Sequence, residues 1–358
     1  MVGINEKIYN VGIIGFGGMA SNHFKQSAEL DRINVKGVFD INPERMEYAK
    51  SVGLIAYESR QALLDDPEID LVLIAVPNHL HKDFAIEALR AGKNVLCEKP
   101  VTMTATELSE IMAVQKETGK VFAIDQNRRV NKDFIAMKRM VESGKIGDVY
   151  VIESRVEGSR GVPAGWRIDP VQGGGMMLDW GVHLIDQIMF MYPHKVTEVF
   201  CKMYSINYPD VDDNFRLTMT FETGLTAHIE VSTNNFINHP RWYVLGTEGT
   251  LQIDGWEATG KAVICKKRED SWGAEIKMTK AGPSKTMAAR SEDSVEVIPI
   301  EAPTDVVDNL NPVYWQLIDA LDGKAPLKIT PEQAMRVVKV MEAAFESAKD
   351  KKVVLTEI

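Results

Sequence analysis

The sequence predicts an α/β protein with two domains, in which a parallel sheet covered by helices precedes a domain that consists mainly of strands. Two patterns lead to this class. Up to residue 125, apolar runs of strand length alternate with segments of helical periodicity, which is typical of a parallel sheet. Residues 196–300 contain mainly successive strands, as in a mostly antiparallel sheet. Single cores stop growing at ~250–300 residues, so we expect the 358 residues to divide into domains 1–125 and 126–358.

A glycine-rich turn joins the first strand to the first helix. Residues 11–14, VGII, form a short apolar strand, and Gly15, Gly17 and Ala20 follow it at G-x-G-x-x-A spacing. Gly15 allows a tight turn, Gly17 lets the backbone approach a pyrophosphate, and Ala20 keeps helix and strand close. Amide groups at the start of a helix attract phosphate. The turn therefore predicts a dinucleotide-binding domain of the Rossmann type.

An acidic residue follows the second predicted strand, residues 35–39. Asp40 stands at the offset from the glycine motif at which a carboxylate binds the ribose hydroxyls of NAD and repels the 2′-phosphate of NADP. Its alternative role is to cap the next helix. Arg45 lies nearby, and an arginine there can hold a 2′-phosphate. We expect NAD as the cofactor, with NADP as the alternative.

The other elements of the first domain continue the alternation. Pro43 starts a helix, Ser59 caps a short one, and Thr104 with Glu107 forms a capping box. Further strands are expected at residues 55–57, 71–76, 94–97 and 121–124, and helices at residues 43–51, 81–91 and 104–118. Ligands bind beyond the carboxyl ends of such strands. We therefore expect one site formed by Gly15, Asp40 and residues 77–81, 98–100 and 125–128.

The second domain is predicted to contain more strands than helices. Helices are expected at residues 134–141, 177–191 and 331–349, and strands at residues 149–157, 196–203, 214–221, 225–232 and 250–253. Thr330 caps the last helix and Pro331 starts it. Gly246 to Gly249 resembles a hairpin turn, and the polar residues 280–294 are expected to form an exposed loop.

Composition and charge restrict the class of function. The net charge of -10 argues against nucleic acid as a partner, because it would repel phosphates. Cys97, Cys201 and Cys265 are widely spaced, which suits a reducing compartment and shows no zinc spacing. No apolar run reaches the ~18 residues of a membrane span, and residues 1–10 lack a signal-peptide core. We expect a cytoplasmic protein with a small-molecule substrate.

Lys99 is the first candidate for chemistry. It lies at the end of a strand between Glu98 and Pro100, facing the expected cofactor site. A lysine there can polarise a substrate hydroxyl, or act as a base if desolvation lowers its pKa. Glu98 can orient Lys99 or contact the cofactor, and Pro100 fixes the turn, in the trans or the rarer cis form. Most lysines are ordinary surface residues, but this location favours function.

The second candidate group follows a run of three glycines, residues 173–175. On a helix, Asp179 and His183 share one face, and Asp186 continues it. An Asp–His pair can remove a proton from an alcohol, because the carboxylate sets the tautomer and stabilises the imidazolium. A half-buried histidine paired with a helix neighbour is the alternative. No third ligand accompanies the pair, so we expect no metal.

Several other residues are weaker candidates. Trp166 and Arg167 can stack on, or hydrogen-bond to, the cofactor or substrate, and either His79 or His81 can contact ribose. Asp169, Asp213, Asn235 and Tyr314 are polar candidates for substrate contacts. The remaining histidines have no assigned role: His23, His194, His228 and His239.

The ordered set GFGGMA, Asp40, PNHLH, EKP, WR and GGG-x-x-x-D-x-x-x-H resembles the glucose–fructose oxidoreductase/inositol dehydrogenase (Gfo/Idh/MocA) family of NAD(P)-dependent oxidoreductases. The resemblance implies a Rossmann domain and a C-terminal α/β domain with a large open sheet, which commonly forms dimer or tetramer interfaces. It also implies that Lys99, Asp179 and His183 are catalytic. Together with the candidates above, the expected cofactor contacts are Gly15, Phe16, Gly17, Gly18, Met19, Ala20, Asp40, Arg45, Ala75, Pro77, Asn78, His81, Glu98, Lys99, Gln126, Trp166 and Arg167.

These residues lead us to expect oxidation of a secondary alcohol of a sugar, glycoside or cyclitol, with hydride transfer to nicotinamide C4. His183, oriented by Asp179, would take the hydroxyl proton while Lys99 holds the same oxygen, or the two would exchange roles. One alternative is a redox-neutral glycosidase that recycles NAD through a 3-keto intermediate. Another is a nucleotide-sensing regulator, which would not need the Lys–Asp–His set.

Overall fold

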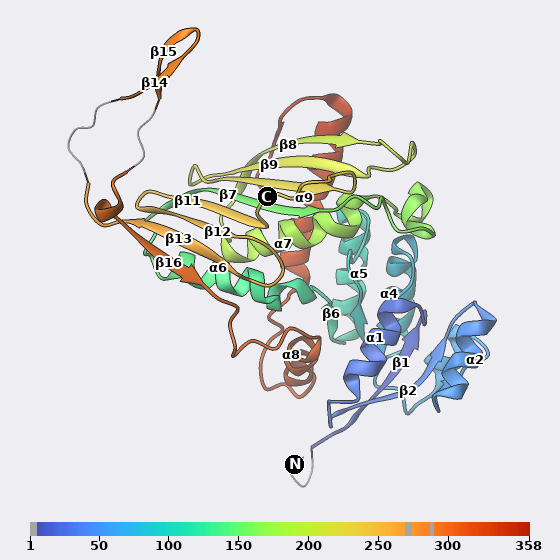
Figure 1. The fold of residues 1–358 in the computed structure, drawn as a ribbon. Helices are drawn as coiled ribbons and strands as arrows, with labels where there is room; N and C mark the ends of the chain where they lie inside the picture. Colours follow the sequence, from blue (N-terminus) through green and yellow to red (C-terminus); the bar gives the residue numbers. More distant parts are fainter. Residues whose placement is uncertain (1–5, 269–273, 287–289) are drawn as a thin grey trace.

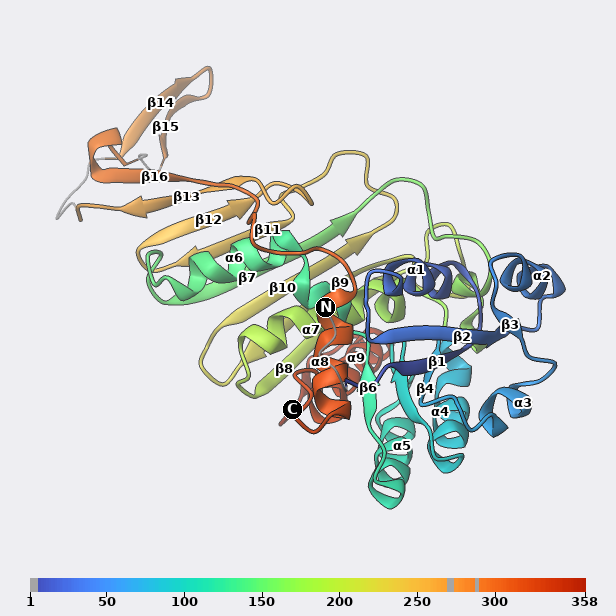
Figure 2. The same cartoon turned by 90° about the horizontal axis from the view of Figure 1, so that it is seen from below.

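The computed structural model describes residues 6–268, 274–286 and 290–358. Two sheets organise the chain, one of six strands and one of nine. The first, blue to teal, lies beside the second, green to orange, in both views of the ribbon (Figures 1 and 2). Helices α7 and α9 lie between them. This arrangement confirms the predicted α/β class.

The six-stranded sheet is wholly parallel, in the order β3-β2-β1-β4-β5-β6. Strand order therefore reverses between β1 and β4, where doubly wound folds bind their ligands. The strands are β1 (Tyr9–Ile14), β2 (Ile33–Phe39), β3 (Ile55–Ala56), β4 (Leu71–Ile74), β5 (Asn94–Cys97) and β6 (Phe122–Ile124). The helices are α1 (Gly18–Ser27), α2 (Pro43–Ser51), α3 (Arg60–Asp65), α4 (His81–Arg90) and α5 (Ala105–Thr118).

Local signals place these elements as expected. Ser59 accepts a hydrogen bond from the amide of Ala62 at the start of α3, and Thr104 and Glu107 form a reciprocal capping box on α5. The predicted strand at residues 71–76 ends earlier, because β4 stops at Ile74 and the following residues line a cavity.

The nine-stranded sheet has the order β16-β13-β12-β11-β7-β10-β9-β8-β17 and is antiparallel except for the β7–β10 pair. Its strands are β7 (Val149–Glu157), β8 (Val196–Tyr204), β9 (Asn214–Phe221), β10 (Thr226–Ser232), β11 (Trp242–Gly246), β12 (Gly249–Ile253), β13 (Gly260–Cys265), β16 (Val295–Ile300) and β17 (Val354–Leu355). The helices of this half are α6 (Lys132–Glu142), α7 (Val182–Met191), α8 (Asn311–Leu321) and α9 (Pro331–Asp350).

The helix α8 returns from the second half to the first sheet. Leu310, Val313, Tyr314 and Leu317 share a buried cluster with residues of β1 and α1. The sequence pattern did not reveal this helix. The boundary at residue 125 stays a prediction, but the core of the nucleotide-binding half includes a segment from near the end of the chain.

Two predictions for the second half need correction. Residues 177–191 are not one α-helix, because a π-helical turn, Met177–Gly181, precedes α7. Part of the expected loop at residues 280–294 is the strand β15 (Gly282–Thr286), which pairs with β14 (Glu275–Thr279) in a hairpin that projects from the body (Figure 1). Residues 287–289 of that loop lie outside the described part. No helix among the described residues is long and apolar enough to cross a membrane.

Candidate active site

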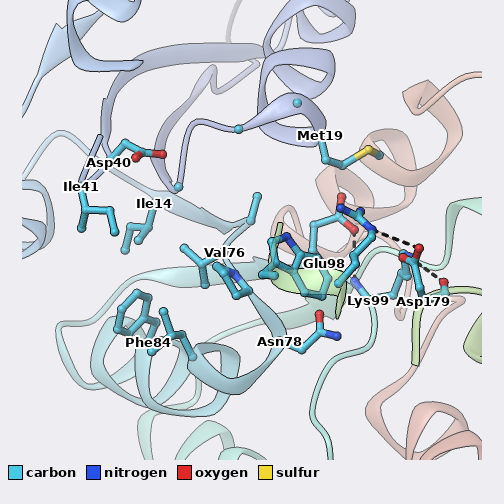
Figure 3. Close-up of a pocket in the computed structure, with 18 of the residues that line it drawn as sticks. Ile14, Met19, Asp40, Ile41, Val76, Asn78, Phe84, Glu98, Lys99 and Asp179 are labelled. Carbon is cyan, nitrogen blue, oxygen red and sulfur yellow. Dashed lines mark hydrogen bonds and ion pairs between the residues drawn. The ribbon is translucent and has the colours of Figure 1, made fainter. Parts of the chain in front are cut away.

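A cavity of about 580 Å³ lies at the carboxyl ends of the parallel strands. Asp40 lies at one end of it, and Lys99 and Asp179 lie at the other (Figure 3). The segments after β1, β2, β4, β5 and β6 all contribute to its wall, together with the π-helical turn of the second half. The expected convergence of strand ends on one site is thus present in the fold.

The turn after β1 leaves room for phosphate at the start of α1. Gly15 has a φ of +87°, and a Cβ there would lie 2.5 Å from the carbonyl oxygen of Ala75. A Cβ on Gly17 or Gly18 would meet nothing within 4 Å, and no side chain caps the helix that they begin. The first amides of α1 therefore face open space in the cavity wall. This fits the pyrophosphate of a dinucleotide.

Asp40 is held at its end of the cavity by backbone groups. Its Oδ2 accepts a hydrogen bond of 2.6 Å from the amide of Phe16, and its Oδ1 accepts one of 2.8 Å from the amide of Asn42. Arg45 does not line the cavity. Arg60 does, with its guanidinium 4.0 Å from the centre of the Phe84 ring. Neither Arg60 nor Phe84 was expected from the sequence.

Lys99 and Asp179 join the two halves at the opposite end. The Lys99 Nζ donates hydrogen bonds to the Asp179 carbonyl, at 2.9 Å, and to its Oδ1, at 3.0 Å. The Asp179 Oδ2 accepts from the Nε of Arg167 at 3.1 Å. Burial raises the pKa of Asp179, but the charges of Lys99 and Arg167 outweigh burial, so its pKa is lowered. The peptide bond between Lys99 and Pro100 is cis.

The expectation that Asp179 orients His183 is wrong. Both carboxylate oxygens of Asp179 bind cations, and a neutral imidazole competes poorly with them. The buried Nδ1 of His183 has no hydrogen-bond partner among the described residues. Burial lowers the pKa of His183 well below 6.5, and Lys99, Arg128 and Arg241 lower it further. Its imidazole is therefore neutral at pH 7 in the cavity wall. Asp186 instead forms an ion pair with Arg129, with its Oδ1 2.6 Å from the arginine Nη2.

The three glycines at residues 173–175 allow close packing beside the catalytic candidates. A Cβ on Gly173 would lie 2.7 Å from the Cβ of Asn78, and one on Gly175 would lie 2.2 Å from the Oδ1 of Asp212. The side-chain amide of Asn78 donates to the Gly173 carbonyl at 2.7 Å. The Asp212 Oδ2 accepts from the amide of Met177 and so caps the π-helical turn. The glycine run thus positions the turn that carries Asp179.

Glu98 belongs to a buried charged cluster that the sequence did not reveal. Its Oε1 lies 3.0 Å from the Nε2 of His23, which also lies 3.3 Å from the Oδ2 of Asp125. The Nδ1 of His23 lies 2.9 Å from the Tyr314 hydroxyl on α8. Burial alone would lower the pKa of His23, but Tyr314, Asp125 and Glu98 raise it well above 6.5. Side-chain atoms of His23, Glu98 and Asp125 lie close enough together to hold a metal ion. The imidazole also lies within ion-pair distance of both carboxylates, and we interpret the cluster as an ion-pair network on that geometry.

Some of the other predicted residues line the cavity and some do not. His81 is not free to contact ribose, because its ring nitrogens lie 2.8 Å from the Pro100 carbonyl and 2.9 Å from the Val76 carbonyl. Predicted residues that line the cavity are Gly15, Gly17, Gly18, Met19, Asp40, Ala75, Pro77, Asn78, Glu98, Lys99, Trp166, Arg167, Asp179 and His183. Those that do not are Phe16, Ala20, Arg45, His81 and Gln126.

Three further lining residues were given no individual role, although the expected site included residues 125–128. They are Asn127, Arg128 and Trp180. Asn127 and Arg128 lie in the segment after β6 that the strand-end rule had already placed at the site, so a signal for them was present. Trp180 follows Asp179 in the π-helical turn, and its ring centre lies 5.7 Å from that of His183.

Two family models match the chain. The first, an oxidoreductase family with an NAD-binding Rossmann fold, covers residues 9–126, and the second, the GFO/IDH/MocA C-terminal domain, covers residues 134–252. An uncharacterized oxidoreductase of Schizosaccharomyces pombe is 36% identical over 345 residues, which span 92% of this chain and 90% of that protein. The chain belongs to the GFO/IDH/MocA family of oxidoreductases. The resemblance stated from the motifs is confirmed.

Other relatives of this GFO/IDH/MocA protein extend along its whole length. The scyllo-inositol 2-dehydrogenase (NADP(+)) of Bacillus subtilis is 27% identical over 352 residues, covering 97% of this chain and 96% of that protein. A solved NAD-binding protein from Listeria innocua has a TM-score of 0.88 and 41% identity, covering 98% of this chain and 97% of that one. The chain is therefore an NAD(P)-dependent oxidoreductase, and the predicted enzyme and cofactor classes are confirmed.

Proposed function

We propose that this GFO/IDH/MocA protein oxidises a secondary alcohol of a sugar, glycoside or cyclitol, with NAD as the hydride acceptor. The observation that carries the proposal is the placement of Lys99 and a neutral His183 in one cavity with the nucleotide-binding turn. The names of two relatives support the substrate class, since one is a scyllo-inositol 2-dehydrogenase and another a myo-inositol 2-dehydrogenase. The backbone-held carboxylate of Asp40 supports NAD over NADP.

Lys99 and His183 have separate roles at the substrate hydroxyl. A lysine ammonium has three donors, and two contacts of the Lys99 Nζ are with Asp179. The third donor can bind the hydroxyl oxygen and stabilise the negative charge that develops there. His183 then accepts the hydroxyl proton, because its ring is neutral at pH 7. A bound oxidised nicotinamide would supply the acceptor for the hydride of the carbon that bears the hydroxyl.

The test of this function follows the absorbance of reduced nicotinamide. We would add NAD, and separately NADP, with a panel of inositols, hexoses, uronic acids and simple glycosides. We expect net reduction with at least one compound, faster with NAD, and no reduction by a Lys99→Ala variant. Consumption of a glycoside without net reduction would instead identify the redox-neutral glycosidase. An enzyme that reduces neither dinucleotide and consumes nothing in the panel contradicts both.

The pH profile of kcat/KM tests the role of His183. Its pKa is lowered, so the imidazole remains neutral below pH 6.5, the pH at which an ordinary histidine is half protonated. We expect the rate to stay on its plateau below pH 6.5 and to fall only at lower pH. A His183→Asn variant should lose most of the rate and this acidic limb, while its affinity for NAD stays close to that of the wild type. If the variant keeps the same acidic limb in its kcat/KM profile, the limb arises from the titration of another group.

We also propose that the chain forms a homodimer or homotetramer through the nine-stranded sheet. One face of this sheet is covered by α6, α7 and α9, whereas no helix of the described residues covers the opposite face (Figures 1 and 2). Phe200 and Tyr204 are exposed on β8, where they alternate with the buried Val199 and Cys201 and so lie on the opposite face. Such large apolar side chains on an open sheet favour a partner sheet.

A further inference from the structure

The cavity end near His183 contains more positive than negative charge. Lys99 and Arg167 share the carboxylate of Asp179, and the buried Arg241 has its Nε 3.2 Å from Asp133. Arg128 also lines the cavity, but its guanidinium has no ion pair or hydrogen bond among the described residues. Its Nε is buried without a partner. The chain as a whole carries a net charge of -10, so the local charge at this end of the cavity is opposite in sign to the net charge.

Arg128 is held in place by aromatic rings. Its guanidinium carbon lies 5.1 Å from the ring centre of Trp180 and 5.9 Å from that of Trp256. Trp180 in turn packs against His183, so Arg128 lies beside the reacting end of the cavity. Stacking on two rings fixes the plane of a guanidinium while leaving its N–H groups free to donate. The guanidinium of Arg128 is therefore held in a fixed orientation, and its N–H groups have no acceptor among the described residues.

Neighbouring groups show that this is a crowded cationic environment. Burial lowers the pKa of Arg241 to about 10, Asp133 partly offsets this, and the charge of Arg128 adds to the lowering. Arg241 also lies over Trp256, at 4.8 Å. Glu98, the other carboxylate at this end of the cavity wall, is already paired with His23. An anion from outside the chain would therefore relieve repulsion that no described carboxylate relieves.

We propose that the substrate carries an anionic group, a carboxylate or a phosphate, and that Arg128 binds it. The inference rests on the proposed function and names its substrate class, an acidic sugar or cyclitol. An Arg fork binds two oxygens of either anion, which fixes the orientation of the ring. Trp180, which lines the cavity, offers an apolar ring against which a sugar can lie. Binding of the anion would also offset the charge that depresses the basicity of His183.

The test compares matched acidic and neutral compounds. Glucuronate, gluconate and glucose 6-phosphate are compared with glucose and myo-inositol in the wild type, in Arg128→Met, and in Arg90→Met, an exposed arginine at the end of α4. We expect kcat/KM for the preferred acid to fall about 100-fold in Arg128→Met, and values for neutral compounds to change by less than about threefold. The identity of the preferred acid decides between carboxylate and phosphate. Equal preference for neutral compounds in the wild type overturns the inference and leaves the proposed function intact.

A second measurement keeps the two proposals separate. Quenching of tryptophan fluorescence by the same acids, with NADH present, reports binding beside Trp180 and Trp256 without turnover. If no compound is oxidised, the proposed function fails, yet acid binding that is lost in Arg128→Met still supports the anion site. Equal binding in both proteins overturns the anion site whatever the turnover. If Arg128→Met does not fold, Arg128→Lys replaces it, and we expect this variant to keep part of the preference, because it retains the charge but not the fork.

Discussion

Replacement of Lys99 by methionine is expected to lower kcat by about 10³-fold or more. The substitution keeps most of the side-chain volume but removes the donor that binds Asp179 and that we propose binds the substrate hydroxyl. In the proposed mechanism the developing oxyanion then lacks its ammonium donor, and Arg167 is the cation partner that Asp179 keeps among the described residues. Initial rates of reduced nicotinamide formation give kcat, and fluorescence titration gives the affinity for the cofactor.

The expected pattern separates a catalytic role from a structural one. We expect the cofactor Kd of Lys99→Met to change by less than about threefold, because Asp40 lies at the other end of the cavity (Figure 3) and the amides at the start of α1 are unaltered. Lys116→Met, which alters an exposed lysine near the end of α5, is the matched control and should match the wild type. A Lys99→Met enzyme with wild-type kcat would remove Lys99 from the mechanism.

Replacement of His23 by leucine is expected to lower the free energy of unfolding by about 3–5 kcal/mol. His23 is fully buried between Glu98 and Asp125, so its removal leaves two carboxylates in the interior without a cation. Urea unfolding followed by fluorescence measures the change. A double variant, His23→Leu with Asp125→Asn, should recover part of the loss, because it removes one of the uncompensated charges. A single variant as stable as the wild type at pH 6 would contradict the ion-pair assignment.

The stabilising effect of His23 should depend on pH in a definite direction. Its folded-state pKa is raised above 6.5, so the folded chain holds a proton that the unfolded chain releases near pH 6.5. The stabilisation is therefore fully present below pH 6.5 and is lost as pH rises through the folded-state pKa. We expect the difference between the wild type and His23→Leu to be large at pH 6 and to shrink toward pH 9.

Much of the fold could be predicted because its signals are local. The spacing of Gly15 and Gly17, the capping box at Thr104 and the apolar run at residues 71–76 each depend on neighbours within a few positions. Ligands of parallel sheets bind beyond the carboxyl ends of the strands, and this rule placed Lys99 and Asp40 in one cavity without knowledge of any contact. The helix α8 was missed, because no strong cap marks its start and its partners lie near the other end of the chain.

The sequence by itself thus determined the class of fold, the nucleotide-binding turn and the set of residues available for chemistry. Only the tertiary structure decided how their charges are paired. It placed Asp179 on Lys99 and Arg167 rather than on His183, brought His23 to Tyr314 across 291 positions, and left Arg128 without an acceptor in the described part of the chain. The physical reason is that element formation depends on periodicity along the chain, whereas electrostatic pairing depends on distances in space and on burial.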